Sequence, residues 1–109
     1  MEKRRFKRTT VSLKAERISG DEKYGIFIEN ISEKGIHMLA THATVHAHYS
    51  AGKNIDVRFH IAQRKKPLLL RCRVRWSCPK VPPNGLTDSI GLEILDPPPQ
   101  YIEFVRTLH

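Results

Sequence analysis

Residues 25–39 read Gly-Ile-Phe-Ile-Glu-Asn-Ile-Ser-Glu-Lys-Gly-Ile-His-Met-Leu. A short apolar run stands on each side of the polar segment 30–35, which is typical of a β-hairpin with a tight connection. Asn and Ser suit such a connection because their short side chains bond nearby backbone amides, and Gly35 suits it because glycine can adopt a positive φ. The segment also offers a carboxamide, a hydroxyl and backbone amides at the rim of a sheet. These groups could hold the edge of a flat polar ring or a phosphate oxygen.

A basic cluster, Arg-Arg-Phe-Lys-Arg, occupies residues 4–8. Guanidinium groups are planar forks that bind phosphate through two hydrogen bonds and can lie flat on an aromatic ring. Residues 1–9 have no apolar period, and we expect them to form a flexible arm. Such an arm and the polar rim could together clamp a ligand that is both anionic and aromatic, and a nucleotide is the obvious candidate.

These two segments resemble the paired signature of PilZ domains, RRxxR on an N-terminal arm followed by [D/N]xSxxG. Segments 4–8 and 30–35 match every signature position, with Asn30 where Asp is commoner. The resemblance extends to residues 74–76, to residues 90–94 and to a closing helix, so it covers nearly the whole chain. It implies a bacterial second-messenger receptor for cyclic di-GMP that signals to a protein partner of unknown identity.

The resemblance also implies which residues bind the ligand. They would be Arg4, Arg5, Arg8, Asn30, Ser32 and Gly35. The arginines would supply stacking and phosphate or guanine-edge contacts, Asn30 and Ser32 would bond a guanine edge or a phosphate, and Gly35 would let the backbone approach. Asn30 offers guanine one acceptor and a competing donor, whereas Asp offers two acceptors but places a negative charge beside the phosphates. Affinity could therefore move in either direction.

Composition sets the class of protein. The 109 residues, of which 39% are hydrophobic, predict one domain with a small core. Residues 1–17 hold seven Lys and Arg residues against two Glu, and this surplus makes up most of the formal net charge of +8. An anionic partner is the natural inference, and a solvated basic tail is the alternative. No apolar run approaches membrane-spanning length, so we expect a cytoplasmic protein without membrane insertion.

Alternation of apolar and polar residues predicts strands along most of the chain. The clearest strand covers residues 70–78, where the alternation places Trp76 and Cys78 on the inward face with Leu70, Cys72 and Val74. Similar patterns occupy residues 11–15, 54–61 and 90–94. Two cysteines six residues apart in one strand are roughly 20 Å apart, too far for a disulfide, so buried or partly buried thiols are expected.

The last segment predicts a helix. Asp96 could cap it, with Pro97 or Pro98 in the first turn, and apolar residues then follow at helical spacing. About six strands joined by short turns, with one late helix, predict an all-β fold: a six-stranded antiparallel barrel over residues 10–109, plugged or flanked by the helix.

Other side chains allow alternative readings. His42, His46 and His48 could suggest a metal site, but no nearby Cys or carboxylate completes a ligand set, so no metal is expected. Arg71, Arg73 and Arg75 could line a phosphate path or form a solvated face. Trp76 could stack on a purine, although its alternation favours the core.

No nucleophile and base are placed together by the sequence, so an enzyme and a resident cofactor are not expected. Two rival functions remain open besides the cyclic di-GMP receptor. One is a small basic barrel that binds nucleic acid, which the net charge and the arginine face support, although nucleic acid is not the partner that we expect. The other is an adaptor that works by protein contacts without a ligand.

Overall fold

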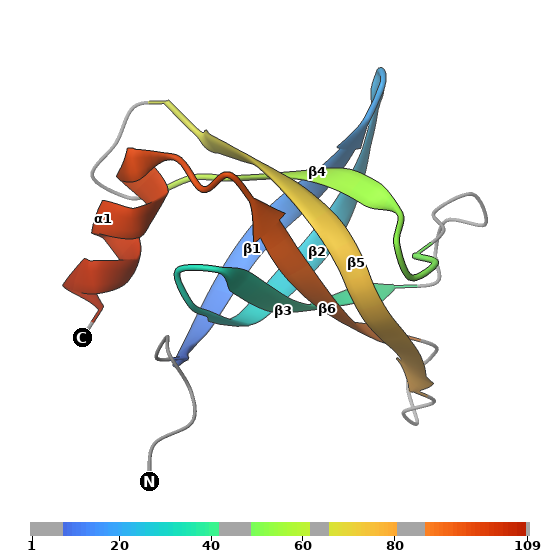
Figure 1. Cartoon of the computed structure of the whole chain (residues 1–109). Coiled ribbons are helices and arrows are strands. Elements are labelled where there is room, and N and C mark those ends of the chain that lie inside the picture. The colour runs from blue at the N-terminus through green and yellow to red at the C-terminus, as the bar shows by residue number, and fades with distance from the viewer. Residues whose placement is uncertain (1–7, 42–48, 62–65, 81–86, 109) are drawn as a thin grey trace, which may run out of the picture.

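The structure, a computed structural model, describes residues 8–41, 49–61, 66–80 and 87–108. Its elements are β1 (Thr9–Ser19), β2 (Glu22–Ile31), β3 (Gly35–Thr41), β4 (Asn54–Phe59), β5 (Leu68–Lys80), β6 (Thr87–Leu95) and α1 (Pro99–Thr107). The strands close into an antiparallel barrel in the order β1-β2-β3-β6-β5-β4 (Figure 1). The prediction of a six-stranded antiparallel barrel with a C-terminal helix is confirmed. Strand β1 already includes Thr9, so the barrel begins inside the segment assigned to the arm.

The barrel interior is filled by the apolar residues of the alternating patterns. Fully buried side chains come from β2, β3, β4, β5 and β6, and include Ile28, Met38, Val57, Leu70 and Ile90. Each such side chain contributes about 1.5–3 kcal/mol when it leaves water. The core therefore fixes which face of each strand points outward.

Helix α1 covers one open end of the barrel (Figure 1). Tyr101 and Val105 are its buried residues, and the ring of Phe59 on β4 packs edge-on against Tyr101 with centroids 6.4 Å apart. The same Phe59 ring lies 5.9 Å from the ring of Phe104. Burial of Tyr101, which the sequence pattern did not single out, thus joins the helix to the core.

The predicted cap of this helix is wrong. The N-cap is Pro98, with an extended backbone and no side-chain cap, and Pro99 is the first helical residue. Asp96 instead has a positive φ of 51°. Residues 96–98 each precede a proline, which disfavours the helical region for the residue before it, so the helix cannot begin earlier.

Two bulges turn side chains outward that simple alternation places inside. In β5, Val74 pairs with Leu92 and Trp76 pairs with Gly91, so one extra residue stands in β5 between neighbouring pairs. An inserted residue inverts the alternation beyond it. Trp76 is accordingly 46% exposed and Cys78 is exposed, so the expectation that both face inward is wrong.

A second bulge lies in β2. Ile28 pairs with Met38 but Asn30 pairs with His37, so β2 has one extra residue between these pairs. Ile31 becomes the fully buried residue that follows Ile28 in the core. Asn30 therefore leaves the inward face and joins the outer surface of the barrel.

Candidate functional site

One cross-strand row on the outer surface carries the candidate site. Thr10 stands opposite Asn30, Asn30 opposite His37, His37 opposite Gly91, and Gly91 opposite Trp76. The row runs across five of the six strands, from β1 through β2, β3 and β6 to β5. It begins beside Arg8, the last residue before β1, and it ends at the exposed indole.

A chain of polar contacts follows this row. Arg8 donates from Nη1 to Oδ1 of Asn30 at 2.8 Å. Nδ2 of Asn30 lies 3.3 Å from Nδ1 of His37, and Nε2 of His37 lies 2.5 Å from Oγ of Ser89. The same Nε2 is 3.7 Å from a carboxylate oxygen of Glu29. The arm segment and the polar rim, which are more than twenty residues apart in sequence, therefore meet through Arg8 and Asn30.

The indole of Trp76 lies over Gly91. A Cβ atom built on Gly91 would collide with the Nε1 side of the indole, so only glycine leaves room for the ring. His37 packs against the same indole, with ring centroids 5.3 Å apart and an interplanar angle of 63°. The ring is thereby held against the sheet while nearly half of its surface stays in solvent, and its open face can stack on a planar group.

The connection between β2 and β3 is closed by Ser32. This residue is only 5% exposed, and its Oγ accepts hydrogen bonds from the amides of Gly35 at 3.1 Å and Lys34 at 3.3 Å. The amide of Ser32 in turn donates to the carbonyl of Gly35 at 2.9 Å. Most of the acceptor capacity of the Ser32 hydroxyl is therefore used to shape the turn.

Gly35 is needed for close packing and not for its backbone angle. Its φ is not positive, so that part of the sequence interpretation is wrong: Gly35 is already the first residue of β3 and is extended. A Cβ atom at Gly35 would lie 3.0 Å from the carbonyl oxygen of Leu92 and 4.0 Å from Nη2 of Arg8. The absent side chain lets β6 and the arm approach the turn.

Helix α1 holds the same turn from the other side. The hydroxyl of Tyr101 donates to the carbonyl of Ser32 at 2.6 Å, and Nε of Arg106 lies 3.2 Å from a carboxylate oxygen of Glu33. Burial raises the pKa of Tyr101 well above its usual range, so the hydroxyl remains a donor. The turn is thus fixed between the barrel rim and the helix.

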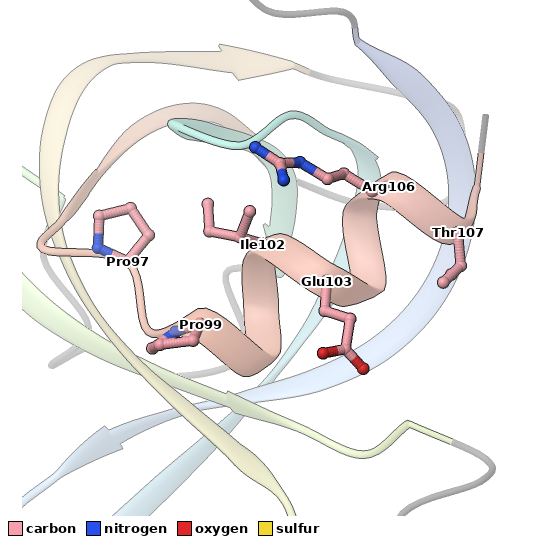
Figure 2. Close-up of a pocket in the computed structure, with 6 residues that line it drawn as sticks. All are labelled: Pro97, Pro99, Ile102, Glu103, Arg106 and Thr107. Carbon is pink, nitrogen blue, oxygen red and sulfur yellow. The ribbon is translucent and has the colours of Figure 1, made fainter.

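A groove follows the outer side of α1. Its lining is formed by Pro97, Pro99, Ile102, Glu103, Arg106 and Thr107 (Figure 2). Of these residues, Arg106 also contacts the β2–β3 turn. The groove lies on the helix surface and not on the cross-strand row.

The remaining predicted residues divide into two sets. Arg4, Arg5 and the three histidines His42, His46 and His48 lie outside the described residues. Arg71, Arg73 and Arg75 lie on the exposed face of β5, where Arg71 is 4.0 Å from Asp56 and the other two are 3.9 and 3.4 Å from Glu93. These arginines form a solvated, partly ion-paired face.

Within the described part of the chain, no group of three His, Cys, Asp or Glu residues could hold a metal ion. In the same part, no helix combines the length and the apolar character needed to cross a membrane. Sequence reasoning missed His37, Ser89 and Gly91 as members of the site. They come beside Asn30 and Trp76 through the pairing of β3 with β2 and with β6, and of β6 with β5.

Comparisons with known proteins agree with this architecture. A family model described as "PilZ domain" matches residues 2–108. Among solved structures, the PilZ domain of Escherichia coli YcgR with c-di-GMP superposes with a TM-score of 0.74 and 12% identity, covering 98% of this chain and 92% of that chain. Curated protein sequences gave no significant match.

Two longer proteins share the fold. Bacillus subtilis MotI/DgrA, an inhibitor of motility, gives a TM-score of 0.72 with 14% identity over 98% of this chain and 51% of its own. The structure of Borreliella burgdorferi PlzA in complex with c-di-GMP gives a TM-score of 0.73 with 17% identity, and the match covers 95% of this chain and 49% of that chain. This chain therefore spans about half the length of these two proteins.

Proposed function

The chain belongs to the PilZ domain family, and from this premise we propose that it is a receptor for cyclic di-GMP. The ligand would bind across the rim formed by segment 30–35 and along the cross-strand row that ends at Trp76. Two of the structural neighbours, the YcgR domain and PlzA, are described with c-di-GMP.

The observation that carries the proposal is the contact between the two signature segments. Arg8 hydrogen-bonds to Asn30 at 2.8 Å, and its guanidinium lies beside Gly35. An arginine held at the rim can donate its remaining N–H groups to a phosphate. Arg4 and Arg5 precede it on the same arm and would add phosphate contacts or stack on the guanine rings.

The other site residues have distinct proposed roles. Asn30 would bond a guanine edge or a phosphate, and Ser32 and Gly35 would keep the turn compact enough for the ligand to approach the backbone. Trp76 would offer its open face to a purine, a contact worth about 1–3 kcal/mol. The sequence alternation of β5 favours a core position for Trp76, and the proposed stacking role takes the place of that expectation.

The signal would be a change of surface. Cyclic di-GMP carries two phosphates and two purines, so it can neutralise the arginines and give them ring faces to lie on. The arm would fold across the rim, and a protein partner would recognise the altered surface. No chemistry on the ligand is required, so the proposed role is that of a receptor and not of an enzyme.

Calorimetric titration with cyclic di-GMP, against GTP and cyclic GMP, tests the proposal. We expect Arg8→Ala to weaken binding at least about tenfold, because a charge-assisted hydrogen bond contributes about 1.5–3 kcal/mol. Arg71→Ala is the matched control, because this arginine is exposed on β5 away from the row.

If the parent protein gave no binding heat at high ligand concentration, the proposal that it is a receptor for cyclic di-GMP would be refuted. A salt-dependent affinity for DNA or RNA, with no preference for the cyclic dinucleotide, would favour the nucleic-acid alternative.

A further inference from the structure

The contacts around His37 determine where its proton lies. The Arg8 guanidinium can only donate hydrogen bonds, so the Asn30 atom that faces it must be the carbonyl oxygen. The NH₂ group of Asn30 then faces Nδ1 of His37, which must accept. The proton of the neutral ring therefore sits on Nε2, from which it donates to Oγ of Ser89.

This arrangement makes the orientation of the Asn30 carboxamide depend on His37. A carboxamide is nearly symmetric in shape, and only its hydrogen-bond partners decide which end is oxygen. An accepting Nδ1 on one side and a donating guanidinium on the other favour the same orientation. His37 thus presents the carbonyl oxygen of Asn30 to Arg8 without touching Arg8 itself.

A proton added to His37 would have to go to Nδ1, because Nε2 already carries one. Two donors, N–H of the ring and NH₂ of Asn30, would then face each other. Rotation of the carboxamide would relieve this conflict, but it would turn the NH₂ group toward Arg8, which also only donates. Protonation of His37 and docking of Arg8 on Asn30 therefore exclude each other.

The charged groups around the ring do not remove this conflict. Glu29 of β2 lies 3.7 Å from Nε2, the nitrogen that is already protonated, so it offers no acceptor at Nδ1. From β5, the ring is covered by the uncharged Trp76, and the neighbouring Arg75 is 3.4 Å from Glu93. From β6 the contact is the hydroxyl of Ser89, and the charged group just before β1 is Arg8, which bonds Asn30.

We propose that His37 is the positioning residue of the ligand site, and that through Asn30 it makes ligand affinity fall as the pH falls. The proposal rests on the proposed cyclic di-GMP site for its ligand and adds the regulation of that site. A histidine side chain commonly changes charge between about pH 8 and pH 5. By linkage, a ligand that needs Arg8 at the rim binds more weakly when His37 holds a second proton.

The binding test compares cyclic di-GMP affinity at about pH 8 and about pH 5.5. For the parent we expect lower affinity at the acidic pH, with a loss of up to about tenfold, the effect of one charge-assisted hydrogen bond. Asn30→Asp should abolish or reverse this loss, because a carboxylate accepts from both Arg8 and a protonated His37. His37→Phe should make affinity independent of pH, and His60→Gln, at an exposed residue outside the row, should keep the parental profile.

Nitrogen NMR of the His37 ring gives a readout that needs no ligand. A neutral ring protonated at Nε2 in the parent supports the proposal, and a ring protonated at Nδ1 overturns it. The same pH profile for the parent and Asn30→Asp would also overturn it. No binding at any pH would refute the cyclic di-GMP receptor instead, and the NMR result would still decide the role of His37.

Discussion

Asn30 and Trp76 stand at two positions of one cross-strand row, and each reaches the outer surface because one extra residue precedes it in its strand. Between them lie His37, which contacts both side chains, and Gly91, which has no side chain to separate the indole from the sheet. The part of the row from Asn30 to Trp76 thereby offers a carboxamide on one side and an aromatic face on the other. A planar, polar ligand can use both.

Substitution of Gly91 by Ala should displace Trp76. The added Cβ would occupy the place of the indole, and the partly exposed ring can swing into solvent while the backbone stays in place. We expect red-shifted fluorescence from this single tryptophan and, if the purine stacks there, a loss of about 1–3 kcal/mol in cyclic di-GMP binding. Gly25→Ala is the matched control, because nothing lies within 4 Å of the added atom. Identical emission and affinity in the two variants would contradict the prediction.

Two bonds tie α1 to the β2–β3 turn, and they should differ in strength. Tyr101→Phe removes a buried 2.6 Å hydrogen bond and leaves the Ser32 carbonyl without that donor, which should cost about 1–3 kcal/mol of unfolding free energy. Arg106→Gln removes an exposed ion pair with Glu33 and should cost less than about 1 kcal/mol. Urea denaturation of both variants measures the difference. Equal losses would show that the Tyr101 hydroxyl does not anchor the helix.

The two thiols should differ in reactivity. Cys72 is fully buried, and burial raises the pKa of its thiol to about 12, whereas Cys78 is exposed beyond the β5 bulge. Because the thiolate is the reactive form, iodoacetamide at about pH 8 should modify Cys78 alone in the folded protein and both cysteines in urea. Mass spectrometry of the labelled peptides decides this. Labelling of Cys72 under native conditions would refute the assigned β5 register.

The ion pair between Arg58 and Glu16 should make the free energy of unfolding depend on pH. The hydrogen bond from Arg58, with 2.6 Å between Nη2 and Oε1, lowers the pKa of Glu16 below its usual value of 4.5. A lowered folded pKa contributes stability at neutral pH that is lost as the pH falls through it. Arg58→Met should therefore be less stable than the parent near pH 7, and the gap should close in acid.

Thermal unfolding across this pH range measures the gap for Arg58→Met. Arg71→Met serves as the comparison, because Arg71 is more exposed and lies 4.0 Å from its carboxylate partner, Asp56. At neutral pH the difference in stability from the parent should be smaller for Arg71→Met than for Arg58→Met. A gap for Arg58→Met that stays constant into acid would show that the pair with Glu16 is not its source.

The amino-acid sequence by itself determined the strands, the hairpin at 30–35, the closing helix and the barrel class. These features follow from local patterns: a period of two for half-buried strands, helical spacing after residue 98, and short polar turns. The two signature segments were also visible, because each is contiguous in sequence. Their guanidinium, carboxamide and hydroxyl groups are of the kinds that bind phosphate or a guanine edge, and this follows from residue type alone.

Only the tertiary structure decided which side chains share the outer face. A bulge depends on how two strands pair, and nothing in β5 alone marks the extra residue that turns Trp76 and Cys78 outward. In the sequence, His37 is one more residue of a hairpin strand. The pairing of β3 with β2 and β6 is what places it between Asn30 and Ser89. Alternation fixes faces only while register is unbroken, and register is a property of two paired strands and not of the sequence of either strand alone.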